Sequence, residues 1–77
     1  MSARDLQTFF LNRLTKARIS KNMTQAEVAN KLGKPQSFVS KYESGERRLN
    51  VIEFIEICKT LGIDPVKIIK EIEAEDG

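Results

Sequence analysis

The chain lacks several residue types on which whole classes of function depend. Its 77 residues include no histidine, no tryptophan and one cysteine. Without histidine, and with Cys58 alone, the usual ligand sets of a structural zinc site are absent and an internal disulfide cannot form. We therefore expect no metal, no cofactor and a reduced, cytoplasmic environment.

Long apolar runs are also missing. No stretch approaches the roughly 20 apolar residues of a membrane span, and the apolar patch at Phe9 has no features of a signal peptide. Catalytic groups are equally scarce, because Cys58 lies among apolar residues and the carboxylates fall on faces that we expect to be solvated. The sequence therefore predicts neither a membrane partner nor an enzyme.

Charge is unevenly distributed along this single small domain. Residues 1–48 contain ten Lys or Arg and four Asp or Glu, whereas residues 49–77 contain three basic and seven acidic residues. The basic first half favours a polyanionic partner, although ordinary solvated helix faces would give a similar imbalance. A chain this short is near the lower limit for an independent core, so a well-packed helical core or a partner subunit is expected to stabilise it.

Start and stop signals predict five helices and an all-α fold. Capping patterns open the helices at Ser2, at Thr24, near Pro35, at Asn50 and at Asp64-Pro65. The first helix fades around residues 20–22, the glycines at 33, 45 and 62 end the next three, and residues 73–77 are expected to fray. Helical spacing assigns the following residues to the inner faces of the first four helices: Leu6, Phe10, Leu14, Ala17, Val28, Ala29, Leu32, Val39, Tyr42, Phe54, Ile55, Cys58 and Leu61.

Residues 24–44 form the pattern that points most directly to a function, two short helices joined by a tight turn at Gly33-Lys34. Such helices cross steeply, so that the first braces against the backbone of double-stranded DNA while the second enters the major groove. Glutamine can pair bidentately with adenine and lysine can reach guanine acceptors. Spacing on the second helix places four predicted base contacts on one face: Gln36, Ser37, Ser40 and Lys41. Phe38 either joins the core beside Tyr42 or contacts a thymine methyl as a further base contact.

Contacts to DNA phosphates are predicted around this motif. Gln25 is the first residue of its helix, where its amide and the N-terminal N–H groups can reach a phosphate. The predicted phosphate contacts are Gln25, Lys21, Lys34, Arg47 and Arg48. Any one of these could be an ordinary exposed residue, and it is their order together that predicts DNA binding.

From about Leu14 to Ile69 the chain resembles the phage-repressor and Cro-type (XRE) helix-turn-helix family. The matching pattern is Thr24-Gln25-x-x-Val28-Ala29-x-x-x-Gly33, followed by Gln36-Ser37-x-Val39-Ser40-x-x-Glu43-x-Gly45. The resemblance implies a compact five-helix, lambda-repressor-like domain that binds operator DNA as a dimer. It also implies a partly buried ion pair between Arg18 and Glu43.

By position in the family pattern, Gln25 would contact phosphate, and Arg47 with Arg48 would lie in a loop that grips the backbone. Gln36, Ser37 and Lys41 would face the bases. The chain departs from the family at Lys34-Pro35, where a Ser or Thr cap is frequent. This departure affects where the recognition helix begins and how deeply Gln36 reaches.

The last helix, residues 64–75, is the predicted dimerisation element. Val66 and Ile69 are expected to cover the core, which leaves Ile68 and Ile72 on an adjacent face as a dimer interface. A two-fold axis through this helix would place the recognition helices about 34 Å apart on an inverted-repeat operator. The alternative is that Ile72 frays with the acidic tail and that the dimer forms only on DNA.

These patterns favour a dimeric transcriptional regulator of the repressor or controller type, with homodimerisation and operator DNA as its interactions. Phage repressors, restriction-modification controllers and antitoxins all have this size. The alternative function is a small helical adaptor or antitoxin that acts mainly through a protein partner bound at the Ile-rich last helix.

Overall fold

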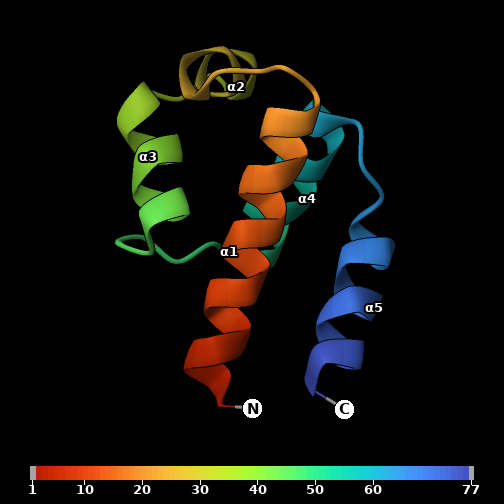
Figure 1. Cartoon of the computed structure of the whole chain (residues 1–77). Helices are drawn as coiled ribbons and strands as arrows, with labels where there is room; N and C mark the ends of the chain where they lie inside the picture. The colour runs from red at the N-terminus through yellow and green to blue at the C-terminus, as the bar shows by residue number, and fades with distance from the viewer. Residues whose placement is uncertain (1, 77) are drawn as a thin grey trace.

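The computed structural model describes residues 2–76, which form five helices and confirm the predicted all-α fold (Figure 1). The helices are α1 (Ala3–Ser20), α2 (Gln25–Leu32), α3 (Gln36–Ser44), α4 (Val51–Leu61) and α5 (Pro65–Asp76). The prediction that residues 73–77 fray is wrong for residues 73–76, which continue α5, and Gly77 lies outside the described residues.

Reciprocal caps begin three of the helices where the sequence places them. At α2 the backbone N–H of Glu27 donates to Thr24 Oγ1 at 3.1 Å, and the backbone N–H of Thr24 donates to Glu27 Oε1 at 3.0 Å. Equivalent capping boxes join Ser2 to Asp5 and Asn50 to Glu53. These bonds satisfy N–H groups that have no partner within the helix, so the helix starts are encoded locally.

The start of α3 differs by one residue from the prediction. Pro35 is the N-cap rather than the first helical residue, with extended φ and ψ of −69° and 155°, and α3 begins at Gln36. Because proline carries no side-chain acceptor, this helix start has no side-chain cap. The α3 helix therefore lacks the reciprocal cap that stabilises the starts of α1, α2 and α4.

The core is formed by side chains from every helix. Its most deeply buried members are Leu14 from α1, Val28 from α2, Val39 and Tyr42 from α3, Ile57 and Cys58 from α4, and Ile68 from α5. The sequence missed Leu11 and Ile57. Of the predicted inner residues, Phe10, Leu32 and Ile55 are half-buried and pack against the core, and Leu6 is half-buried at its edge. Burial raises the pKa of the Cys58 thiol to about 11, which agrees with the packing role expected for it.

The face of α5 that packs on the core is not the predicted one. Ile68 is 1% exposed and belongs to the core, whereas Val66 and Ile69 are 53% and 43% exposed. The α5 helix lies beside α1 (Figure 1), and an ion pair of 2.6 Å joins Arg13 Nε to Glu71 Oε2 between them. Because residues 68, 71 and 72 share one side of a helix, this packing turns Ile68 inward. The assignment of Ile68 to a dimer interface is therefore wrong, and Ile72 is half-buried against the core.

Candidate nucleic-acid interface

The α2 and α3 helices pack together at one end of the molecule, joined by a three-residue turn (Figure 1). Gly33 ends α2 with φ of +69°, a left-handed conformation that glycine adopts without steric cost. Its neighbour Lys34 donates its backbone N–H to the Ala29 carbonyl at 2.9 Å, which closes the helix end. The turn lets Val28 and Ala29 of α2 pack with Val39 of α3 in the core, and so fixes how α3 faces solvent.

The outward side of α3 is a polar surface, which we call the α3 polar face. It consists of Gln36, Ser37, Ser40 and Lys41, as the helical spacing predicts. Ser40 is half-buried and its hydroxyl donates to the Ser37 carbonyl at 3.3 Å, while the other three side chains are exposed. The amide, hydroxyl and ammonium groups of this face are the kinds of group that bind base edges in a major groove.

Phe38 lies on the opposite side of α3, in the core. It is 9% exposed, and its ring centroid is 5.6 Å from that of Tyr42 in an edge-to-face arrangement. Of the two alternatives left open by the sequence, packing beside Tyr42 is therefore correct, and the assignment of Phe38 as a base contact is wrong. The rest of the ring is covered by cations, with the Arg47 guanidinium 4.7 Å and Lys34 Nζ 5.6 Å from its centroid.

Arg18 and Glu43 form the expected ion pair between α1 and the end of α3. The distance from Arg18 Nε to Glu43 Oε2 is 2.7 Å, and that from Nη2 to Oε1 is 3.1 Å. The two side chains are only 14% and 7% exposed. The hydrogen bonds to Glu43 raise the pKa of Arg18, and Arg18 Nη1 also donates to the Met23 carbonyl at 2.8 Å. Arg18 therefore connects α3 to α1 and to the turn before α2.

Gln25 contributes to the same cluster. Its Nε2 donates to Glu43 Oε1 at 3.0 Å, a contact that the sequence did not predict because 18 residues separate the two and no spacing rule relates them. A side-chain amide has two N–H groups, and the bond to Glu43 uses one of those of Gln25. The Gln25 side chain is thereby held in one orientation within the fold.

Arg47 is also engaged within the fold, which the sequence did not predict. Its Nη1 and Nη2 donate to Glu53 Oε1 and Oε2 at 2.9 and 2.8 Å. This paired geometry raises the pKa of Arg47 and, together with the backbone N–H of Asn50, lowers the pKa of Glu53. Of the predicted phosphate contacts, the exposed ones are Lys21, Lys34 and Arg48.

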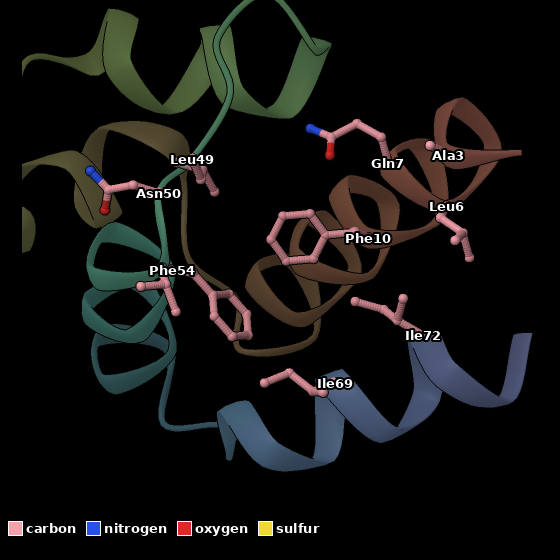
Figure 2. A pocket seen from close by; sticks show the side chains of 10 residues that line it. Ala3, Leu6, Gln7, Phe10, Leu49, Asn50, Phe54, Ile69 and Ile72 are labelled. Carbon is pink, nitrogen blue, oxygen red and sulfur yellow. The ribbon is translucent and has the colours of Figure 1, made fainter. Parts of the chain in front are cut away.

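A second surface lies between α1, α4 and α5 and is shown in Figure 2. This apolar groove has a volume of about 450 Å³ and is lined by Ala3, Leu6, Gln7, Phe10, Leu49, Asn50, Val51, Phe54, Ile69 and Ile72. The rings of Phe10 and Phe54 meet edge-to-face in it, with centroids 5.3 Å apart. Val51 is 63% exposed, so much of the groove faces solvent.

Within residues 2–76, no helix has the length and hydropathy of a membrane-spanning segment.

The turn between α2 and α3, together with the polar outer side of α3, defines a helix-turn-helix protein. Residues 14–68 match the helix-turn-helix family. A solved structure of an XRE-family like protein from Pseudomonas syringae pv. tomato str. DC3000 is 43% identical, with a TM-score of 0.92 and a match covering 96% of this chain and 90% of that chain. None of the curated proteins matches the chain. The chain therefore belongs to the XRE-type helix-turn-helix family of DNA-binding regulators.

Proposed function

We propose that the chain is a sequence-specific transcriptional regulator that binds operator DNA as a homodimer and inserts α3 into the major groove. The observation that carries this proposal is the α3 polar face, which presents Gln36, Ser37 and Lys41 to solvent on a helix whose other side is buried. The ion pair between Arg18 and Glu43 supports it, because a recognition helix must be held rigidly to discriminate between bases.

The side chains of this surface have separate roles in the proposal. The α3 polar face binds base edges, with a bidentate contact from Gln36 to adenine as the best match of its chemistry. Lys21, Lys34 and Arg48 bind phosphates together with the remaining N–H of Gln25, and so set the register of the helix on the duplex.

The apolar groove supports the homodimer. Ile69 and Ile72 line it from α5 and Val51 lines it from α4, and Ile69 and Val51 are exposed. Exposed apolar side chains grouped in this way are typical of an interaction surface. If the dimer forms there, its two-fold axis must place the two α3 helices about 34 Å apart to reach successive major grooves, and the operator must be an inverted repeat.

Selection of bound sites from a pool of random duplexes tests the proposal. The expected result is an inverted repeat whose half-sites lie about one helical turn apart, with an affinity that falls steeply as salt rises. Lys41→Ala should relax the preference at one position of each half-site, while Lys31→Ala on the exposed side of α2 serves as the control. A selected pool without a shared motif would exclude sequence-specific binding.

The same groove favours a second candidate, an adaptor or antitoxin that binds a protein partner. The two candidates differ in whether the groove mediates self-association of the purified protein. A wild type that stays monomeric at micromolar concentration and shows no operator preference would favour the protein partner over the homodimer.

A further inference from the structure

Arg47 occupies an unusual position between the recognition helix and α4. Its guanidinium makes the paired contact to Glu53 on α4, and the same group lies 4.7 Å from the centroid of the Phe38 ring on α3. Its backbone N–H donates to the Lys41 carbonyl at 3.2 Å. One residue of the loop between α3 and α4 therefore holds α3 at two points, and both lie beside residues of the α3 polar face.

We propose that Arg47 is a positioning residue for DNA recognition, which holds α3 through Phe38 and Glu53 and does not bind a phosphate. This inference rests on the proposed function, since it concerns the accuracy with which α3 is presented to DNA. It reverses the role that the sequence pattern assigns to Arg47, and it leaves Arg48 as the phosphate contact of this loop.

The hydrogen bonds of the Arg47 guanidinium within the fold support this role. Two of its three nitrogens donate to the Glu53 carboxylate, and Nη1 donates in addition to the Arg48 carbonyl at 3.1 Å. The Arg47 side chain is still 41% exposed, but a phosphate bound in the same paired geometry would have to displace a carboxylate that already matches the planar fork of arginine. Glu53 is itself held, because its Oε1 also accepts the backbone N–H of Asn50 at 3.0 Å.

The position of Phe38 also supports a positioning role for Arg47. Phe38 follows Ser37 directly and lies three residues before Lys41 on the same helix, so a contact that holds Phe38 in place also restrains these two members of the α3 polar face. The α3 helix has no side-chain cap at its start, so its orientation depends on side-chain contacts such as this one. A guanidinium stacked on an aromatic ring provides such a contact, and lysine does not reproduce its planar geometry.

The decisive variants are Arg47→Lys, Phe38→Leu and the two together, with Arg48→Ala as the matched control in the adjacent position. Arg47→Lys keeps the charge but loses the planar fork, and Phe38→Leu keeps an apolar side chain but removes the ring. Affinity is measured over a range of salt concentrations for two duplexes, namely the one selected by the wild type and the same duplex with one altered base pair.

We expect Arg47→Lys to leave the slope of log affinity against log salt unchanged while the preference for the selected duplex falls about tenfold. The double variant should lose no more preference than Arg47→Lys alone, because both changes remove the same contact. Arg48→Ala should lower the slope by about 0.9 and leave the preference unchanged. If Arg47→Lys keeps the full preference while Arg47→Ala lowers the slope as Arg48→Ala does, Arg47 is a phosphate contact and the inference is wrong.

A measurement without DNA separates this inference from the proposed function. Amide hydrogen exchange of residues 38–44 in α3 should become faster in Arg47→Lys and in Glu53→Gln, but not in Arg48→Ala. A wild type that binds no duplex overturns the proposed function. Unchanged amide exchange in both Arg47→Lys and Glu53→Gln overturns the positioning role of Arg47, whether or not the protein binds DNA.

Discussion

The α3 polar face and the apolar groove are both exposed surfaces, but they are built in different ways. Behind the α3 polar face, side chains are joined by specific bonds, with Glu43 accepting from both Arg18 and Gln25. The groove is formed by apolar side chains such as Phe10 and Phe54, which pack by shape alone. A surface that discriminates between base pairs requires hydrogen-bonding groups held in fixed orientations. A surface for self-association requires apolar area and shape complementarity.

The largest effect is expected when the ion pair between Arg18 and Glu43, behind the α3 polar face, is broken. Glu43→Gln leaves the guanidinium of Arg18 without a counter-charge in a site where it is only 14% exposed. We expect the free energy of unfolding to fall by about 3 kcal/mol, at the lower end for a buried pair because some solvent contact remains. Urea denaturation measures the change, with Glu46→Gln in the exposed loop as the control. Equal stability of the two variants would show that the cluster does not hold α3.

The next effect concerns the α3 polar face itself. Gln36→Ala should cost about 1–3 kcal/mol of discrimination at one base pair of each half-site, because a bidentate contact is lost. Its effect on stability should be small, since Gln36 is exposed. Binding to a panel of single-base-pair variants of the selected duplex provides the measurement. A loss of affinity that is equal for every duplex would remove Gln36 from the set of base contacts.

A smaller effect is expected at the apolar groove. Ile69→Glu places a charge in the proposed dimer surface, and we expect self-association to weaken at least tenfold, or about 1.4 kcal/mol. Ile19→Glu is a matched control, because Ile19 is 58% exposed on α1 and does not line the groove. Sedimentation equilibrium at micromolar concentration compares the two. Dimerisation that responds to Ile19→Glu and not to Ile69→Glu would place the interface elsewhere.

The two surfaces also differ in how well the sequence predicts them. Helix starts such as Thr24 with Glu27 are local signals, and the spacing of Gln36, Ser37 and Lys41 follows from helical geometry alone. The contacts from Arg47 to Glu53 and from Gln25 to Glu43 depend on how helices pack, so no spacing within one helix indicates them. The local pattern fits the α3 surface because helical spacing fixes which side chains share a face, even though the helix begins one residue later than predicted.

The α5 helix shows why the other surface was harder to predict. Its segment has apolar residues at 66, 68, 69 and 72, which provide two overlapping stripes, and either stripe could face the core. Packing against α1, with Arg13 paired to Glu71, selects the stripe that includes Ile68. The choice is made by a partner helix more than 50 residues away in the chain, which a pattern confined to α5 does not contain.

The smallest effect distinguishes the two surfaces by their response to acid. Glu53 supports the α3 side through Arg47, and its pKa is lowered by hydrogen bonds from Arg47 and from the Asn50 backbone. A lowered folded-state pKa contributes stability that is complete above the ordinary glutamate value of about 4.3 and is lost as the pH falls through the folded-state value. Glu53→Gln should therefore reduce the acid-dependent part of the unfolding free energy, while its amide oxygen can still accept the Asn50 N–H.

The measurement is the slope of unfolding free energy against pH below about 4.5, for wild type, Glu53→Gln and the exposed control Glu56→Gln. Glu53→Gln should flatten the slope of unfolding free energy against pH more than Glu56→Gln does. Arg47→Lys should have an intermediate effect, because lysine keeps the charge but not the paired geometry. The protection of the α3 amides, taken relative to their intrinsic exchange rate at each pH, should fall over the same pH range, since protonation of Glu53 releases its paired contact with Arg47. If the slope is the same in Glu53→Gln as in wild type, the contact between Arg47 and Glu53 does not connect α3 to α4 in solution.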